Sequence, residues 1–167
     1  MSETRWLSED EQRVWREFGV ATGMVQGHLE GQLSRDSGMP LAYYEVLVAL
    51  SEAPGRSLRM SELATALHSS RSRLSHAVAR LEANDWVRRE ACPTDKRGAW
   101  AVLTPAGFAA LEAAAPGHVD AVRKSLFDAL TPEQVRQLGE IMAAIRNQLT
   151  PQCAVAVAAA AELVESS

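Results

Sequence analysis

The chain has 167 residues, 47% hydrophobic and 23% charged, which is enough apolar material for one ordinary domain or two small lobes sharing a core. No apolar run reaches the roughly 18–20 residues that a membrane span needs, and the polar start MSETRWLSEDEQ predicts no signal peptide. The two cysteines lie far apart and form no metal-type or redox-motif spacing, so we expect no metal, no cofactor and a reducing cytoplasm.

The net charge of −4 is unevenly distributed. Residues 55–100 contain nine basic and five acidic side chains, whereas the rest of the chain contains eight basic and sixteen acidic ones. The middle third is therefore a basic island in an acidic protein. Such an island is found on solvated surfaces and on nucleic-acid-binding faces, and only a motif within it can distinguish the two.

Residues 8 to about 34 are predicted to form a long helix. Ser8 precedes an acidic first turn, as at a helix N-terminus, and apolar side chains recur at steps of three and four from residue 14 onward. Gly38 and Pro40 end the pattern. A helix on the order of 40 Å long cannot bury its whole length in one small lobe, so we expect it to pack on a second chain.

Three shorter helices are predicted next. Residues 41–53 form the first of them, which ends at a Pro-Gly pair and is followed by a short extended segment, RSLRM. Ser61 is expected to cap the second, and Ser69 or Ser70 the third. This third helix carries the functional argument.

The helix at residues 70–83 has two chemically different faces. One is predicted to be buried and combines Ser70 with apolar residues at 74, 77, 78 and 81. The opposite face is small and polar at its centre and carries arginines at its edges. Small residues let a helix enter a DNA groove, and arginine can bind guanine with two hydrogen bonds or pair with phosphate. The candidate DNA-binding residues here are Ser70, Arg71, Ser72, Arg73, Ser75, His76 and Arg80.

A β-hairpin is predicted over residues 87–103, with the strands VRREAC and AWAVL and the charged tip PTDKRG. Asp95 and Arg97 can form an ion pair that stiffens the tip. Alternatively, Arg97 can extend into a minor groove, with Lys96 on phosphate. Both hold if Asp95 orients the base of the loop, so all three residues are candidates for DNA binding.

Two further helices follow the hairpin. Thr104 and the proline after it begin the first, which Pro116 and Gly117 are expected to kink. Thr131 and Gln134 form a capping-box pattern at the start of the second, whose apolar face continues to about residue 149. The remaining residues form an alanine-rich tail, which either adds a short helix or frays.

The order of these elements resembles the MarR family of bacterial transcriptional regulators. SRSRLSHAVARLE is similar to the recognition helix of that family, and REACPTDKRGAWAVLTPAG is similar to its wing, in which Asp95-x-Arg97-Gly98 precedes an apolar strand, Leu103-Thr104 and Gly107. The resemblance covers about residues 8–149. It implies a mainly α fold with a small antiparallel β-wing, a winged helix-turn-helix that dimerises through its N- and C-terminal helices. The expected parts are a dimerisation helix (1–40), a DNA-binding lobe (41–103), C-terminal dimerisation helices (104–150) and the tail (151–167).

The resemblance also implies a function. Members of the family bind a pseudopalindromic DNA operator as homodimers and are released by a small, often phenolic or aromatic, ligand, and we expect a repressor. A ligand cavity is expected where the first, second and fifth helices meet the DNA-binding lobe, near Trp15, Phe18, Tyr43 and His118, although Trp15 and Phe18 also fit plain core positions. The chain departs from the family at His76, where many members have arginine, and at Asp85, which replaces a common glycine.

Other functions remain as alternatives. Oxidation of Cys92 on the hairpin could disturb DNA contact and would make the protein a redox sensor, although no lysine or histidine near it in sequence activates it. A winged helix can also serve as a protein-interaction module without binding DNA. An enzyme is not expected, because the sequence contains no Ser-His-Asp or HExxH arrangement and no glycine-rich phosphate loop after a strand.

Overall fold

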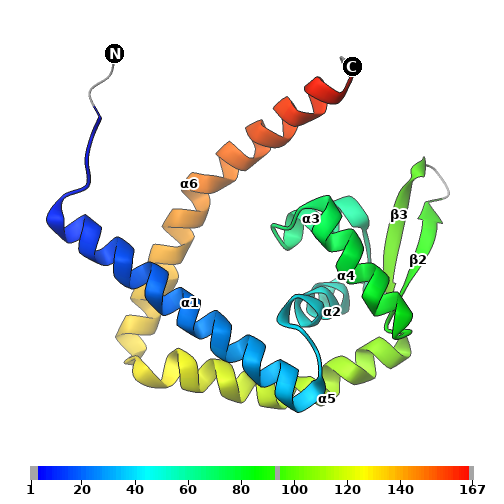
Figure 1. Cartoon of the computed structure of the whole chain (residues 1–167), viewed down its shortest axis with the longest axis horizontal. Helices are drawn as coiled ribbons and strands as arrows, with labels where there is room; N and C mark the ends of the chain where they lie inside the picture. The colour runs from blue at the N-terminus through cyan, green and yellow to red at the C-terminus, as the bar shows by residue number, and fades with distance from the viewer. Residues whose placement is uncertain (1–3, 93–94, 166–167) are drawn as a thin grey trace. The chain divides into compact units, whose positions relative to one another are not determined.

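The computed structural model describes the backbone of residues 4–92 and 95–165, and the side chains of residues 4–91 and 98–149. The chain divides into two compact units, Met1–Arg123 and Lys124–Ser167. The elements, in chain order (Figure 1), are α1 (Glu9–Ser37), α2 (Leu41–Glu52), a 3-10 turn (Pro54–Arg56), β1 (Ser57–Arg59), α3 (Met60–Ala66), α4 (Arg71–Ala83), β2 (Val87–Cys92), β3 (Asp95–Leu103), α5 (Pro105–Ser125), a second 3-10 turn (Phe127–Ala129) and α6 (Pro132–Glu165). The mainly helical fold with a small antiparallel sheet confirms the prediction.

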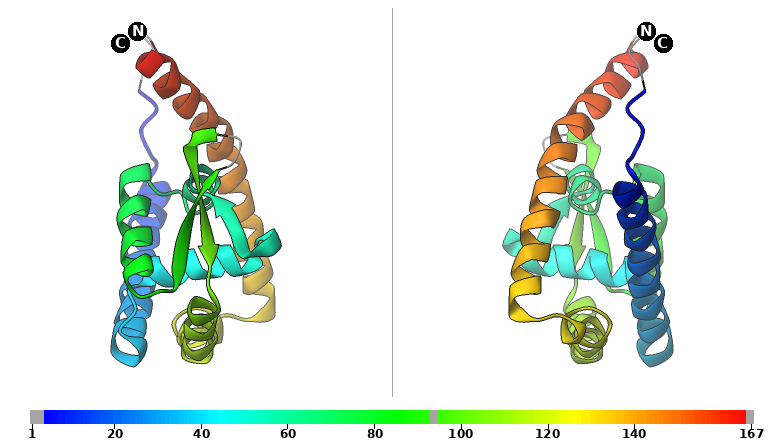
Figure 2. Two further views of the ribbon diagram at one scale, coloured as in Figure 1. Left: turned by 90° about the vertical axis from the view of Figure 1, so that its right-hand side faces the viewer. Right: turned by 90° about the vertical axis from the view of Figure 1, so that its left-hand side faces the viewer.

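The sheet forms the wing of a winged helix-turn-helix. Its three strands are antiparallel in the order β1-β3-β2, so β3 is the central strand. Ala101 on β3 pairs with Leu58 of β1 on one side and with Arg89 of β2 on the other. The β2–β3 hairpin lies beside α4 (Figure 2). A wing strand and the helix next to it are thereby brought into contact.

The core of the first unit is enclosed by α2, α3, α4 and the sheet. Leu47, Leu50, Leu63 and Leu81 have no exposed surface, and Val87 at the start of β2 is 2% exposed. Burying a leucine contributes about 1.5–3 kcal/mol to folding. Because these side chains come from separate elements, their packing holds α4 with one face inward and leaves the opposite face to solvent.

Helix α1 is capped at both ends as the sequence predicts. Ser8 and Glu11 form a reciprocal capping box, and the helix ends at Gly38, whose φ of 62° is left-handed. Most of its length is exposed, including the large apolar side chains of Trp15 (65%) and Met24 (70%). Within the first unit, only the C-terminal turns of α1 reach the core, where Leu33 is fully buried.

A tight junction joins the wing to α5. The carbonyl oxygen of Trp86 accepts hydrogen bonds from the backbone nitrogen of Thr104 at 3.0 Å and from its Oγ1 at 3.1 Å. That Oγ1 also accepts a hydrogen bond from the backbone nitrogen of Gly107 at 3.0 Å and so caps α5. A Cβ atom at Gly107 would lie 2.0 Å from the Trp86 oxygen. Only glycine allows α5 to begin this close to the wing.

Asp85 precedes this junction and carries backbone strain. Its φ is 58°, in the left-handed region, where a residue with a side chain costs roughly 1–2 kcal/mol relative to the right-handed conformation. The glycine that is common at this position in the MarR family would adopt it freely. Thr104 Oγ1 lies 2.6 Å from the Asp85 carbonyl oxygen, so the same threonine that caps α5 also contacts this strained residue.

Two local expectations differ from the structure. The N-cap of α3 is Arg59, two residues before the predicted Ser61, which lies inside the first turn. Ser70 is the N-cap of α4, as predicted, but it is exposed, whereas it was expected on the buried face. Helix α5 contains Pro116 and ends at Ser125, and the kink expected at Pro116 and Gly117 stays a prediction. The alanine-rich tail, expected either to add a short helix or to fray, is helical as the continuation of α6, which extends through Pro151 to Glu165.

We expect Gly107→Ala to lower the free energy of unfolding by about 3 kcal/mol, since the added methyl group must displace the Trp86 carbonyl or the start of α5. Urea unfolding followed by circular dichroism measures this. Gly139→Ala is the control, because nothing lies within 4 Å of a Cβ there, and it should leave the protein as stable or up to about 1 kcal/mol more stable. Equal stability of the two variants would contradict the tight junction.

Candidate nucleic-acid interface

Helix α4 presents one face to the core and the other to solvent. Leu74, Ala77, Val78 and Leu81 are its buried residues. Its N-terminus is capped by Ser70, whose Oγ accepts a hydrogen bond from the backbone nitrogen of Arg73 at 3.3 Å. The packed face turns the opposite side of α4 to solvent, and the cap closes its first turn.

The outer face of α4 has the composition expected for entry into a groove. Ser72, His76 and Ala79 are exposed and small or polar. The exposed guanidinium groups of the helix belong to Arg71, Arg73 and Arg80. None of these three arginines forms an ion pair with any residue whose side chain the structure describes. Their positive charges are therefore available to a phosphate or a base.

Ser75, another predicted base contact, has a partner within the protein. Nη2 of Arg89 on β2 donates a hydrogen bond to the Ser75 carbonyl oxygen at 2.8 Å and lies 3.5 Å from its Oγ. Arg89 also pairs with Glu82 near the end of α4, at 3.4 Å between Nε and Oε2. Arg89 belongs to the basic island but is not among the residues predicted for the site. The only sequence signal for its role is its place on the strand that directly follows α4.

The wing contributes less to the described site. Arg88 on β2 is exposed and pairs with Glu90 on the same strand, at 2.6 Å between Nε and Oε1. The predicted tip residues Asp95, Lys96 and Arg97, as well as Cys92, lie outside the residues whose side chains are described. The two open roles of Arg97 and the redox role of Cys92 therefore stay predictions.

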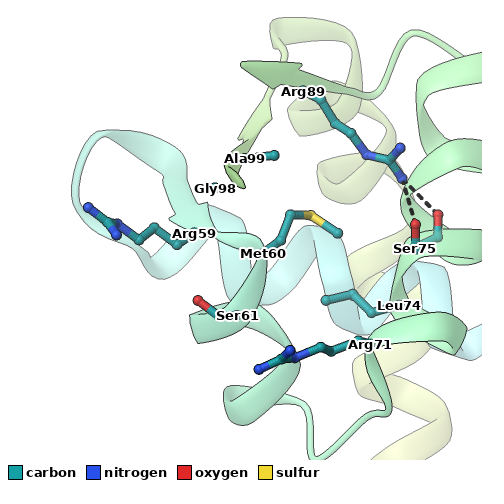
Figure 3. Close-up of a pocket in the computed structure, with 9 residues that line it drawn as sticks. All are labelled: Arg59, Met60, Ser61, Arg71, Leu74, Ser75, Arg89, Gly98 and Ala99. Carbon is teal, nitrogen blue, oxygen red and sulfur yellow. Dashed lines mark hydrogen bonds between the residues drawn. The ribbon is translucent and has the colours of Figure 1, made fainter. Parts of the chain in front are cut away.

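A cavity of about 440 Å³ lies between the recognition helix and the wing (Figure 3). Met60, Leu74 and Ala99 provide apolar walls, and Arg71 and Arg89 enter from α4 and β2. In the close-up, the side chain of Arg89 reaches from the strand toward Ser75 along one edge of this cavity. The cavity marks the seam between the two elements of the candidate interface.

The four candidate ligand residues are not gathered into one site. The rings of Trp15 and Phe18 stack with their centroids 6.2 Å apart on the exposed side of α1. His118 contacts the ring of Tyr44, at 4.3 Å between centroids, whereas the predicted residue was its half-buried neighbour Tyr43. Exposure of Trp15 and Phe18 excludes a core role within this chain.

The half-buried side chain of His118 on α5 lies near Tyr44 of α2 and Gln32 of α1. Burial lowers the pKa of its imidazole below the ordinary value of 6.5 and raises the pKa of the Tyr44 phenol. Two buried atoms of described residues have no hydrogen-bond partner there, Nδ1 of His118 and Oε1 of Gln32. Gln32 packs against Gly117, next to His118, and donates a hydrogen bond to Asp36 at 2.9 Å. Sequence reasoning missed Gln32, because a helix-surface glutamine carries no signal of burial.

Among the described residues there is neither a candidate metal site nor a candidate membrane-spanning helix. No group of three or more His, Cys, Asp or Glu side chains is placed to hold a metal ion. No helix is long and apolar enough to cross a membrane.

Comparisons with known proteins place these features in a family. The model of the MarR family matches residues 37–98. The MarR family transcriptional regulator Sco3205 from Streptomyces coelicolor, solved in complex with DNA, is 57% identical, with a TM-score of 0.84, 87% of this chain covered and 92% of that chain. AbsC, a MarR family transcriptional regulator from the same organism, is 41% identical, with a TM-score of 0.83 and coverage of 89% and 99%. No curated protein matches the chain.

Arg80→Ala tests whether the unpaired guanidinium groups of α4 contact DNA phosphates. We expect weaker binding to DNA of any sequence and a decrease of about one in the slope of log affinity against log salt concentration, because one phosphate contact is lost. Fluorescence anisotropy at several salt concentrations measures the slope. Arg13→Ala, which removes an α1 arginine paired with Asp10, is the control. If both variants keep the wild-type slope, Arg80 does not lie on phosphate.

Proposed function

The chain belongs to the MarR family of transcriptional regulators, and from that premise we propose that it is a cytoplasmic repressor that binds a pseudopalindromic operator as a homodimer and leaves it when a small aromatic ligand binds. The observation that supports this best is the outer face of α4, which is small and polar at its centre, edged by arginines that form no ion pair with the described side chains, and adjacent to a wing. This is a surface for binding DNA, and no reaction chemistry is assigned to it.

Each half-site receives one α4 in the major groove. Ser72, Arg73, Ser75 and His76 face the base edges, where hydroxyl, guanidinium and imidazole groups can read donor and acceptor patterns. His76 stands where many members of the MarR family have arginine, and its ring nitrogens offer a hydrogen-bond donor and an acceptor to a base edge. Arg71 and Arg80 lie at the edges of the helix and contact phosphate groups. Ser70, at the N-terminus of the helix, lies next to the DNA backbone.

The wing extends the contact to the neighbouring minor groove. In this proposal Arg97 enters that groove, Asp95 orients the base of the tip, and Lys96 contacts phosphate. An arginine in a narrow A·T-rich minor groove is attracted by its concentrated negative potential. The wing therefore favours particular DNA shapes, while α4 reads the bases.

A second copy of the chain covers the apolar face of α1. Val14, Trp15, Phe18 and Met24 are between 40% and 70% exposed, and α6 separately exposes Ile141, Met142, Ile145 and Leu149 to a similar degree. Exposed large apolar side chains that recur along a long helix mark a protein–protein interface. A two-fold dimer places its two recognition helices about 10–10.5 base pairs apart, centre to centre, which accounts for a pseudopalindromic operator.

The ligand acts by preferring the dimer geometry that does not fit DNA. The surroundings of His118 support a site for a small aromatic molecule, because the Tyr44 ring, the neutral imidazole of His118 and the amide oxygen of Gln32, which lacks a described partner, occur together there. To move the protein from 99% to 1% in the DNA-binding geometry, the ligand must bind the other geometry about 10⁴-fold more tightly.

Selection of bound genomic fragments by the purified full chain tests the proposal. We expect a small set of fragments that share an inverted repeat with half-sites about one helical turn apart. The gene beside the fragment then suggests ligands, each of which is tested for release of the DNA. A lack of enrichment over bulk DNA would instead favour a protein-interaction module, and loss of binding only on oxidation would favour a redox sensor.

Arg97→Ala should weaken binding to the selected fragment at least about tenfold without lowering the unfolding temperature, because a tip arginine supports DNA contact and not the core. Anisotropy titration measures the first quantity and thermal unfolding the second. Arg136→Ala, on α6, is the charge-matched control and should bind normally. Retained affinity in Arg97→Ala would remove the wing tip from the interface.

Sedimentation equilibrium tests the dimer independently of DNA. The wild-type protein should have twice the mass of the chain at micromolar concentration. Trp15→Asp should shift it toward the monomer, since a charge then replaces a large exposed apolar side chain of α1. A monomeric wild-type protein would be incompatible with the proposed homodimer.

A further inference from the structure

Arg89 is the residue that connects the wing to the recognition helix. Its backbone nitrogen donates a hydrogen bond to Oε1 of Glu82 at 2.9 Å, while its Nε lies 3.4 Å from Oε2 of the same carboxylate. The far end of the guanidinium group donates to the carbonyl oxygen of Ser75 at 2.8 Å (Figure 3). A single side chain on β2 thus contacts α4 at two places.

The two contact points lie seven residues apart on α4. Seven residues are about two helical turns, or about 10.5 Å of helix axis between the two Cα positions, so Ser75 and Glu82 share one face of α4. One guanidinium group reaches the carbonyl oxygen of Ser75 and the carboxylate of Glu82, and the backbone nitrogen of Arg89 donates to the same carboxylate. These contacts add to the core packing of α4 and restrict its orientation on the side that meets β2.

The chemistry of the contact requires arginine. The planar guanidinium group offers several N–H donors in a fixed fork, so it can bind a carboxylate and a carbonyl oxygen at the same time. Lysine would keep the charge but lacks this geometry. The Arg89 and Glu82 side chains are 33% and 32% exposed, and partly exposed ion pairs contribute little to global stability. The main effect of the contact is therefore on geometry.

The neighbouring arginine provides a natural comparison. Arg88 precedes Arg89 on β2, carries the same charge and is 61% exposed at its side chain, but its partner is Glu90 on the same strand. No contact of Arg88 with α4 is found among the described residues. The two side chains thus differ in whether they hold the recognition helix.

We propose that Arg89 is a positioning residue that sets the orientation of α4 against the wing and thereby determines discrimination between operator and other DNA. This rests on the proposed function, because it presupposes that α4 reads bases. Hydrogen bonds to base edges weaken steeply when their angles change, whereas phosphate contacts made by long flexible side chains follow a displaced helix. Loss of the Arg89 contacts therefore lowers affinity for the operator selectively.

The test compares Arg89→Ala with Arg88→Ala, since each removes one positive charge from adjacent positions of one strand. Affinities for the selected operator and for a scrambled duplex of equal length are measured by anisotropy over a range of salt concentrations. Arg89→Ala should lose about tenfold or more on the operator, less than about threefold on the scrambled duplex, and keep the wild-type salt slope. Arg88→Ala should change the ratio of the two affinities by less than about twofold.

Two results would overturn the proposal. Equal losses on both duplexes, with the salt slope reduced by about one, would make Arg89 a direct phosphate contact. Wild-type affinity for both duplexes would remove Arg89 from the positioning role altogether. A wild-type protein that does not distinguish the two duplexes would overturn the proposed function itself, and with it the role of Arg89.

Two further variants guard against a folding defect. Arg89→Lys keeps the charge but cannot reach both partners, so it should lose operator discrimination with an unchanged salt slope. Glu82→Gln keeps an oxygen acceptor for the Arg89 backbone nitrogen but removes the ionic contact, so its loss should be intermediate. Wild-type discrimination in both variants would overturn the proposal, whatever the stability of Arg89→Ala.

Discussion

The carbonyl oxygen of Trp86 holds the DNA-binding lobe together at its base. It accepts two hydrogen bonds from Thr104 at the end of the wing, and it lies where a side chain on Gly107 would have to be. The end of α4, the start of β2, the end of β3 and the start of α5 meet around this one atom. The recognition helix and the wing are thereby connected to the start of α5 through short-range contacts of Trp86, Thr104 and Gly107.

The contacts of α4 divide its charged residues into two groups. Arg71, Arg73 and Arg80 have no ionic partner among the described side chains, whereas Glu82 on the same helix is engaged by Arg89. A net charge of −4 is therefore compatible with DNA binding, since the acidic residues lie mostly outside the basic island. Repulsion between DNA and the acidic remainder also favours contact through the α4 side of the molecule.

Local signals were sufficient to predict most of the fold. The N-cap at Ser8, the capping box at Thr131, the helix end at Gly38 and the buried apolar residues of α4 all depend on neighbours within a few residues. Their physical causes can therefore be evaluated from short segments. Membership of the MarR family was likewise visible in two motifs. The state of the tail after Pro151 was left open between a short helix and a frayed end, and it continues α6, because proline disfavours a helix locally but does not always end it.

The contacts that define the site depend on longer distances in sequence. Arg89 meets Ser75 across 14 residues and two elements, and no periodicity predicts which strand arginine faces the helix. The burial of Gln32 depends on the approach of Gly117 from α5, which the sequence of α1 does not contain. Tyr44 was missed in favour of Tyr43 because a rotation of one residue on α2 decides which ring meets His118.

The exposed apolar face of α1 has a consequence for gene control. If a second chain buries this apolar face, the dimer becomes more stable as the protein concentration rises, because the partner chain binds only the folded protein. Occupancy of the operator then depends on roughly the square of the amount of free chain when the monomer predominates. Dilution at cell growth, or faster degradation of the monomer, would relieve repression more steeply than loss of a monomeric regulator could. In the proposed homodimeric regulator, the number of copies in the cell would thereby influence operator occupancy, alongside the proposed ligand.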